Sequence, residues 1–370
     1  MTCTRREFVV GAVATTAGSA EAAVRRRAVY VGCYTGPDRR GIWLTHLDPE
    51  SGHLAPPRPV AEAVNVSSMV LHPNGRSLFA VNEIGDFQGT DHGAVSAFRI
   101  EADGALRVVS QVSSRGGGPC YISLDRRTRR ALVANYGGGS VAALPVRADG
   151  GLESASGFVQ HPRTPGAAPH AHAIHIAPDN QAAFVSDLGL DRVSRYEYDA
   201  QTGRLEETGA HHALLPAASG PSNLCLHPDG RVLYALHETA NRVTAYRVGK
   251  GLRELATVGT LPAGFSGKSW SGDVLCHPNG RVLYTSNCGH DSIARYALDR
   301  EGRPTLLDHT PTGGKIPRGF ILDAEFLVAA NLESGSVVSF RIAPQDGALT
   351  PTGSRVEIPR PVCVRIQAEA

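Results

Sequence analysis

Short apolar stretches recur along this chain, and many of them lead into a turn of proline, asparagine or aspartate, and glycine. The clearest copies read Leu-His-Pro-Asn-Gly-Arg from Leu71, Leu-His-Pro-Asp-Gly-Arg from Leu226 and Cys-His-Pro-Asn-Gly-Arg from Cys276. Such residues favour a tight reversal between antiparallel strands. A looser copy surrounds Pro178, and degenerate copies begin at Leu124 and Leu322. Together they indicate a repeat of about fifty residues.

Each copy places its apolar and polar positions in the same order. In the copy from Leu226, the turn is followed by an apolar second strand over 232–236, a third strand of alternating character over 242–248 and an outer strand over 252–258. Alternation at period two is typical of a half-buried strand. Four antiparallel strands repeated at this period predict the blades of a β-propeller.

The two ends of the chain predict one divided blade. Residues 28–47 match a second and a third strand but have no first strand before them, whereas 361–366 read as a first strand with nothing after it. We therefore expect the C-terminal strand to join the N-terminal blade and close the ring, which removes exposed sheet edges. The prediction is an all-β, seven-bladed propeller with four antiparallel strands per blade, forming a single domain over 28–367.

The first residues have the order of an export signal. Adjacent arginines, Arg5 and Arg6, precede an uncharged and weakly apolar stretch over 9–18 and a small-residue cleavage pattern at 20–22. This order predicts a twin-arginine signal over 1–22 and a secreted or extracytoplasmic protein. The alternative is a tail that happens to carry two arginines. No later apolar run is long enough to cross a bilayer.

Composition narrows the classes of partner and site. The formal net charge is +2, with both signs scattered along the chain and no basic stripe, which argues against nucleic acid or an acidic membrane surface as a partner. Of seven cysteines, six lie beyond the predicted signal, and none forms a C-x-x-C pair. Neither a zinc ribbon nor a thioredoxin-like site is indicated, and buried free thiols are favoured over disulfides.

Alignment of the blades separates architectural polar residues from exceptions. A polar residue recurs at the end of the second strand, and we interpret it as a turn or capping group. Its copies are Asn82, Asn135, Asp187, His237, Asn287 and Asn331. The next position is mostly tyrosine or apolar, but it is a carboxylate at Glu83 and Glu238.

A second aligned position lies at the start of the innermost strand, six residues before the turn proline or its counterpart. Its seven copies are Ser67, Cys120, His172, Ser222, Gly272, Arg318 and Val362. The innermost strands of a propeller surround its axis, so these side chains are expected to ring one end of the central channel. His172 and Arg318 are the exceptions in a small or neutral set, and such groups are costly to gather unless they are used.

His170 and His172 form an H-x-H pair, and on a regular strand they would share one face, with His175 on the other. This is a spacing seen in metal sites, but the sequence fixes no third ligand beside it. A catalytic, a structural and a metal-binding interpretation of these histidines remain open. The catalytic interpretation requires neither a metal nor another cofactor.

Four segments carry a resemblance to a known family. They are Asn-Tyr-Gly-Gly-Gly-Ser-Val at 135–141, Pro-His-Ala-His at 169–172, Ser-Asp-Leu-Gly-Leu-Asp-Arg-Val at 186–193 and Ile-Pro-Arg-Gly-Phe at 316–320. With the repeat, they resemble the seven-bladed lactonase family, which includes a bacterial 6-phosphogluconolactonase and the fungal carboxy-cis,cis-muconate cyclase. The likeness runs from about residue 28 to residue 366.

In the cyclase branch the resemblance implies a site made of a histidine, two arginines and a glutamate. The histidine falls on His172 or on His170, the glutamate on Glu238 and one arginine on Arg318. The second arginine is replaced by Ser222, which cannot supply a permanent cation. His237 and Asp273 also depart from the family's usual Asn and Glu. We therefore expect four further residues to contact substrate: His237, Asp273, Glu83 and Ser222.

The function expected from the sequence is an exported lactone hydrolase. His172, assisted or replaced by His170, would activate water as a general base, Glu238 would orient that water or share its proton, and Arg318 would stabilise the developing oxyanion or bind a substrate carboxylate. The expected partner is a small lactone, sugar or aromatic-derived and not phosphorylated, acted on by a monomer. The alternatives are a muconate-type cycloisomerase and a non-catalytic binding propeller.

Overall fold

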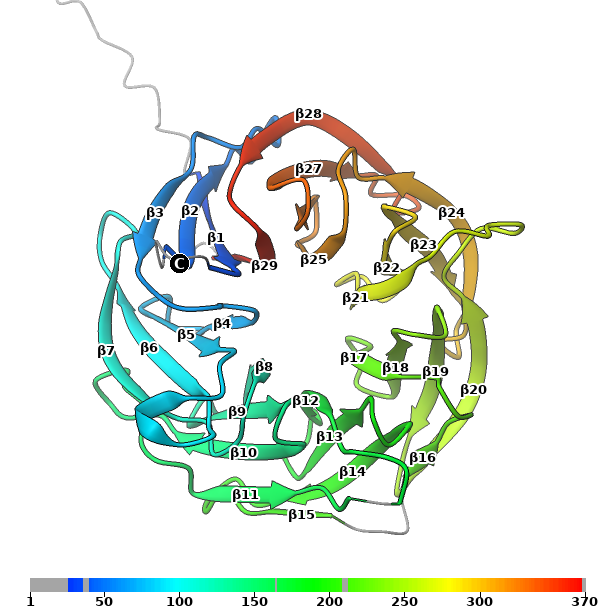
Figure 1. Cartoon of the computed structure of the whole chain (residues 1–370). Helices are drawn as coiled ribbons and strands as arrows, with labels where there is room; N and C mark the ends of the chain where they lie inside the picture. Colours follow the sequence, from blue (N-terminus) through cyan, green and yellow to red (C-terminus); the bar gives the residue numbers. More distant parts are fainter. Residues whose placement is uncertain (1–25, 36–39, 164, 208–211, 368–370) are drawn as a thin grey trace, which may run out of the picture.

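The computed structural model describes residues 26–35, 40–163, 165–207 and 212–367. In these residues seven antiparallel sheets are arranged as blades around a central axis, with the first strand of each blade innermost (Figure 1). The predicted all-β, seven-bladed propeller is confirmed. The predicted export signal over 1–22 lies outside the described residues. No helix in the described part of the chain is long and apolar enough to span a membrane.

The strands of the first four blades, from the innermost outward, are as follows. Blade 1 contains β29 (Pro361–Ile366), β1 (Arg27–Cys33), β2 (Ile42–Leu47) and β3 (Arg58–Ala61). Blade 2 contains β4 (Met69–Leu71), β5 (Ser77–Asn82), β6 (Ala94–Ile100) and β7 (Leu106–Ser113), with the short 3-10 helix η1 (Phe87–Gly89) between β5 and β6. Blade 3 contains β8 (Pro119–Leu124), β9 (Arg130–Asn135), β10 (Ser140–Pro145) and β11 (Gly157–Gln160). Blade 4 contains β12 (Ala171–Ile176), β13 (Ala182–Asp187), β14 (Arg192–Tyr198) and β15 (Leu205–Glu207), and the short β16 (Ala213–Leu214) also pairs with β14.

The remaining three blades are regular. Blade 5 contains β17 (Pro221–Leu226), β18 (Val232–His237), β19 (Arg242–Val248) and β20 (Leu252–Gly259). Blade 6 contains β21 (Trp270–Cys276), β22 (Val282–Cys288), β23 (Ser292–Leu298) and β24 (Pro304–Pro311). Blade 7 contains β25 (Pro317–Leu322), β26 (Phe326–Asn331), β27 (Ser336–Ile342) and β28 (Leu349–Glu357).

The predicted ring closure is present in blade 1. Strand β29 pairs antiparallel with β1, so that Val364 lies opposite Val31 and Arg365 lies opposite Tyr30. Val364 is fully buried and packs in a core cluster with Phe326 and Val328 of blade 7. The cores therefore lie between neighbouring blades, and the C-terminal strand completes both a sheet and an inter-blade core.

The repeated turn has a stereochemical basis. The glycine of the regular turn adopts a positive φ, 68° at Gly75, 73° at Gly230 and 69° at Gly280, which is unfavourable for a residue with a Cβ atom. The preceding asparagine or aspartate accepts a hydrogen bond from the backbone two residues further on, as Asn74 does from Arg76 at 2.9 Å. These turns connect the first and second strands on one face of the ring.

The polar residue at the end of the second strand is structural in at least three blades. Its amide donates to the segment that precedes the blade's first strand: Asn82 to Val64 O at 2.8 Å, Asn135 to Ser114 O at 3.0 Å and Asn287 to Thr260 O at 2.7 Å. These side chains are fully buried. The sequence-based interpretation of this position as a capping group is confirmed for them.

The other aligned position coincides with a β-bulge. In the first strands of blades 3 to 7 the register against the second strand shifts at the same place, so that residues including Cys120, His172 and Arg318 have no direct partner there. Ser222 and Gly272 lie within the equivalent shifts of β17 and β21. A bulge bends a strand and redirects a side chain. The aligned position thus lies at the start of the first strands, at one end of the channel.

Candidate functional site

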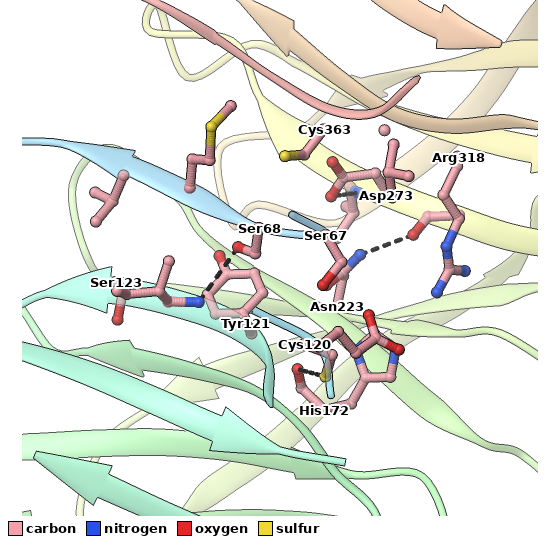
Figure 2. Close-up of a pocket in the computed structure, with 18 of the residues that line it drawn as sticks. Ser67, Ser68, Cys120, Tyr121, Ser123, His172, Asn223, Asp273, Arg318 and Cys363 are labelled. Carbon is pink, nitrogen blue, oxygen red and sulfur yellow. Dashed lines mark hydrogen bonds between the residues drawn. The ribbon is translucent and has the colours of Figure 1, made fainter. Parts of the chain in front are cut away.

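A cavity of about 400 Å³ occupies the central channel. Its walls come from the first strands, several of whose side chains are labelled in Figure 2, and from the residues that follow several second strands. Six of the seven residues predicted to ring the channel line it. They are Ser67, Cys120, His172, Gly272, Arg318 and Val362. His172 and Cys120 lie at one side of the cavity in Figure 2, and Asp273 and Cys363 lie at the other.

Three predicted catalytic residues from three blades meet in this cavity. His172 is bulged from β12, Arg318 is bulged from β25, and Glu238 follows β18. The Glu238 Oε2 atom lies 3.7 Å from His172 Nε2 and 3.5 Å from Arg318 Nη1. The carboxylate is thus shared between an imidazole and a guanidinium.

Burial sets the charge of each group. His172 is 6% exposed, and burial lowers its pKa to about 4, an effect that nearby Glu238 opposes and Arg318 reinforces. Burial also disfavours the charge on Arg318, but Glu238 and then Tyr34 outweigh it and raise the pKa of Arg318. At neutral pH the site therefore holds a neutral imidazole next to a charged guanidinium.

Two tyrosines border this group. The Tyr34 hydroxyl donates to Glu83 Oε2 at 3.1 Å, and burial followed by the charge of Glu83 raises the pKa of Tyr34. Glu83, predicted to contact substrate, thus lines the cavity as a second carboxylate. The ring of Tyr136 meets that of His172 edge-on, with centroids 5.9 Å apart. Burial raises the pKa of Tyr136, so both tyrosines are neutral hydrogen-bonding groups.

His170 does not line the cavity with His172. It precedes β12, stacks on Tyr136 with ring centroids 4.5 Å apart, and lies 2.9 Å through Nδ1 from the Tyr136 carbonyl oxygen. The two histidines were expected on one strand face, and this expectation was wrong because the bulge at His172 breaks the alternation. His170 thus supports the wall at Tyr136. No cluster of three or more potential metal-ligating side chains occurs among the described residues.

His237 and Ser222 are also displaced from their expected roles. Neither lines the cavity: His237 is 3% exposed, Ser222 is fully buried, and the described residues supply no hydrogen-bond partner for His237 Nε2 or Ser222 Oγ. The bulge in β17 spans two residues, and the second of them, Asn223, faces the cavity instead. Direct contact of either residue with a substrate in this cavity was therefore a wrong expectation.

A second ring of polar groups lies along the first strands, at the second bulge residues of β17 and β21 and beyond the bulge of β29. Asp273, predicted from the sequence, lines the cavity here, and burial raises its pKa to about 6 while Arg365 opposes the shift. Arg365 donates through Nε to Met69 O at 2.6 Å and through Nη1 to Val364 O at 2.7 Å. Asn223 donates to Gly272 O at 2.7 Å. This ring is suited to hydrogen bonding with a polar ligand.

Sequence reasoning missed Arg365, although the repeat contains its signal. Three positions after each bulge residue the seven blades read Val70, Ser123, His175, Cys225, Leu275, Ile321 and Arg365. Arg365 is the one residue of this set with a permanent charge. A third aligned position would have identified it by the argument that identified Arg318.

Blade 4 anchors the segment that carries His172. Asp187 occupies the capping position, and its Oδ2 lies 2.5 Å from His161 Nδ1, while His161 Nε2 lies 2.7 Å from the Tyr196 hydroxyl. The other carboxylate oxygen accepts from His170 N at 2.8 Å. Burial tends to raise the pKa of Asp187, but the hydrogen bonds from His161 and His170 outweigh it and lower the pKa. This buried network fixes the backbone just before the bulge.

Comparison with known proteins identifies the family of the chain. Residues 28–366 match the family model described as Lactonase, 7-bladed beta-propeller. The chain is 33% identical to the 6-phosphogluconolactonase of Bacillus subtilis, over 91% of this chain and 97% of the relative. It is 28% identical to a 6-phosphogluconolactonase of Formosa agariphila, over 87% of this chain and 94% of the relative.

A solved structure is similar over the whole ring. The periplasmic gluconolactonase of Pseudomonas aeruginosa superposes with a TM-score of 0.85 at 31% identity, covering 93% of this chain and 99% of the other. The family-model match covers the same blades whose first strands build the cavity. The chain therefore belongs to the seven-bladed β-propeller lactonase family.

Proposed function

We propose that this protein is a lactone hydrolase that opens a sugar-derived lactone with a water molecule activated by His172. The proposal is carried by the meeting of His172, Glu238 and Arg318, three residues from three blades, in the channel cavity. A neutral base, a carboxylate and a fixed cation within 4 Å of the carboxylate are a set of groups suited to ester hydrolysis by water.

The attacking water is held between His172 and Glu238. In the tautomer that carries its proton on Nδ1, Nε2 of His172 accepts a hydrogen bond, as Oε2 of Glu238 does. The two atoms lie 3.7 Å apart, so that one water can donate to both. Its oxygen attacks the lactone carbonyl carbon, while the imidazole takes one of its protons. A general base of this kind contributes about 10²- to 10⁴-fold to a rate.

Arg318 stabilises the charge that develops on the carbonyl oxygen. Its guanidinium remains protonated throughout, and Glu238 holds it 3.5 Å away in a partly buried site where electrostatic interactions are strong. The carbon–oxygen bond of the ring then breaks, and the imidazolium of His172 returns its proton to the leaving oxygen. Lactone and water thus give a hydroxy acid.

The remainder of the cavity favours a neutral, polyhydroxylated substrate. Asn223, Ser68 and Ser123 offer hydrogen-bonding groups along its wall, and about 400 Å³ accommodates a single sugar ring. Glu83 and Glu238 at the other side would repel a phosphate group. The relatives named 6-phosphogluconolactonase and gluconolactonase make aldonolactones the first substrates to examine.

The test is acid release from a panel of lactones by purified protein. We expect hydrolysis of glucono-δ-lactone, weaker hydrolysis of its 6-phosphate, and a loss of about a hundredfold or more in kcat/KM for His172→Ala and for Arg318→Ala. Full activity of both variants would overturn the proposed mechanism. A folded protein inactive on every lactone but able to bind one would favour a non-catalytic binding propeller.

A muconate-type cycloisomerase is disfavoured by Ser222. The position that carries a second arginine in that branch holds here a buried serine outside the cavity. Arg318 is then the cation paired with Glu238, at a site where that branch has two arginines. An ultraviolet assay of muconate cyclisation distinguishes the two reactions.

Export of the protein is also part of the proposal. It rests on the paired arginines Arg5 and Arg6 ahead of an uncharged segment, and on a similar solved protein that is named as periplasmic. A lactonase outside the cytoplasm would meet free sugar lactones more readily than phosphorylated ones. Secretion of the full-length chain, followed by N-terminal sequencing of the exported form, tests this step.

A further inference from the structure

Arginines line a groove on the face of the ring opposite the catalytic group. The groove lies at the turns that connect the first and second strands of blades 2 and 3, whereas Glu83 and Glu238 follow second strands at the other face. It has a volume of about 1130 Å³. Its arginines are Arg76, Arg99, Arg127, Arg129, Arg130 and Arg147.

Asp149 is the one acidic residue among those that line the groove, and it already forms an ion pair within the protein. It pairs with Arg147 through Nε at 3.0 Å and Nη2 at 2.7 Å, and it accepts from Gly151 N at 2.9 Å. The hydrogen bond from Arg147 comes first among the causes that lower the pKa of Asp149 to about 2. Five arginines of the groove therefore remain without a carboxylate from its lining.

Some of these arginines build the wall and others are available to a ligand. Arg130 donates to Ala200 O and to Gln201 O, both at 2.5 Å, and so joins blade 3 to blade 4. Arg127 and Arg129 are exposed. Neither side chain forms a hydrogen bond or an ion pair with another described residue. Their guanidinium groups can therefore pair with groups from outside the protein.

The repeat itself shows that this turn is exceptional. Three regular turns each contain one arginine, namely Arg76, Arg231 and Arg281, and Arg231 is paired with Asp229 at 2.7 Å. The β8–β9 turn instead reads Asp-Arg-Arg-Thr-Arg-Arg over 125–130. Such a cluster is absent from the equivalent turns, so the architecture of a blade does not require it.

The β8–β9 turn is also held in place from within. Asp125 is 1% exposed, and its Oδ1 accepts from Arg129 N at 2.7 Å and from Arg130 N at 3.2 Å. Asn180 of blade 4 accepts from Arg126 N at 2.9 Å. The carboxylate of Asp125 thus organises the backbone, while the side chains of Arg127 and Arg129 remain exposed at the surface.

We propose that this arginine groove binds a linear acidic polysaccharide through the carboxylates of its sugar residues. Guanidinium groups match carboxylates in a two-pronged geometry, and the exposed Arg127 and Arg129, with the positive charge of the other groove arginines around them, suit a chain with repeated negative charges. Neutral hydrogen-bonding side chains lie among the arginines, at Asn74, Thr128 and Gln201, and can bind sugar hydroxyls. The net charge of +2 did not predict this groove, because the fold gathers arginines from separate turns.

Two other polyanionic partners fit the groove less well. Single-stranded nucleic acid is usually held by aromatic side chains that stack on its bases, and no Phe, Tyr or Trp lines this groove. A bilayer surface is usually met by exposed apolar residues beside the cations. The exposed large apolar residues of the described chain, Val108, Leu214 and Leu307, all lie outside the groove.

The test measures binding of a fluorescently labelled oligogalacturonate by anisotropy at low ionic strength. We expect saturable binding that weakens as salt is added. The double variant Arg127→Ala/Arg129→Ala should bind about tenfold more weakly or worse, since it loses two charge-assisted hydrogen-bonding groups. This double variant and the parent protein should hydrolyse lactones equally, because the groove lies away from the cavity.

The matched control is Arg231→Ala/Arg281→Ala, which removes the same charge from equivalent turns of blades 5 and 6 and should leave binding within about twofold of the parent. Equal losses in the two double variants would overturn the proposal and indicate a general charge effect. Absence of oligogalacturonate binding by the parent protein would also overturn it. So would tighter, Arg127- and Arg129-dependent binding to an oligothymidylate or to anionic phospholipid vesicles, which would identify a different class of partner.

Discussion

Replacement of Glu238 by glutamine tests the electrostatic core of the proposed mechanism. The change keeps the size of the side chain but removes the charge that lies 3.5 Å from Arg318 and 3.7 Å from His172. Two unit charges 3.5 Å apart attract each other by about 5 kcal/mol at an effective dielectric constant of about 20. Removal of one partner would also leave Arg318 with an uncompensated charge in a partly buried site.

Only part of this attraction should appear in the stability of the protein. The side chains of Glu238 and Arg318 are 20% and 23% exposed, so solvent screens the pair, and Glu83 continues to contribute negative charge nearby. We expect the free energy of unfolding to fall by about 1–3 kcal/mol, as for a hydrogen bond to a charged group. Urea denaturation of the parent and the variant measures this change.

The effect on catalysis should be larger than the effect on stability. Glutamine offers the attacking water an amide oxygen, which is a weaker acceptor than a carboxylate. The His172 pKa also loses the contribution that opposes burial, so the base becomes weaker. We expect kcat/KM to fall by about a hundredfold or more. The assay is acid release from glucono-δ-lactone by pH-stat titration.

An exposed glutamate on the same face provides the control. Glu333 follows β26, lies outside the cavity, and should tolerate Glu333→Gln with no change in rate or stability. If Glu238→Gln is folded and its kcat/KM stays within about threefold of the parent value, the carboxylate neither orients the water nor tunes the base. The proposed roles of Glu238 would then be refuted.

Further predictions concern pH, closure, capping and export. The free energy of unfolding should fall as the pH is lowered from about 6.5 towards 4, because buried histidines with a pKa near 4 in the folded protein take up protons on unfolding. The expected slope is about 1.4 kcal/mol per pH unit for each histidine. Urea midpoints measured across this pH range test the expectation, and a flat profile would contradict it. The histidines are His172, His175 and His237. Deletion of 361–370 should remove β29, expose the edge of β1 and cause aggregation, whereas a truncated monomer with an unchanged Tm would contradict the role of closure. Asn135→Ala should lower the free energy of unfolding by about 1–3 kcal/mol but leave activity per folded molecule intact, as denaturation and the lactone assay together can show. Arg5→Lys/Arg6→Lys should hold the precursor in the cytoplasm, which cell fractionation would detect; normal secretion of that variant would contradict twin-arginine export.

The fold was predictable because several copies of the repeat carry the same pattern of strands and turns. One ambiguous turn, such as the copy at Leu124, does not affect a conclusion supported by three clear copies. Closure of the ring was predictable from the same repeat, because the N-terminal segment lacks a first strand and the C-terminal segment consists of a first strand alone. Their pairing between Val31 and Val364 follows the prediction.

The site was predictable only where comparison between blades isolates a residue. His172 and Arg318 stand out in an otherwise small or neutral set, and both line the cavity. Sequence alone placed His170 beside His172, because a regular strand alternates its side chains, and a one-residue bulge removes that regularity. In β17 a two-residue bulge leaves Ser222 buried outside the cavity and places Asn223 at the cavity, which no periodic pattern specifies.

The pairing of β29 with β1 has a consequence for how the chain folds. Every other strand pair in a blade joins segments that are near in sequence and can form from local hairpins. Closure instead joins Val31 to Val364, and the entropy of closing so long a loop must be overcome without help from a local turn. Until then blade 1 has only three strands, and the inner edge of β1 is open to pairing with another chain. Closure should accordingly be the last and slowest step of folding, and the interval before it should be the period in which the protein is most prone to misassembly.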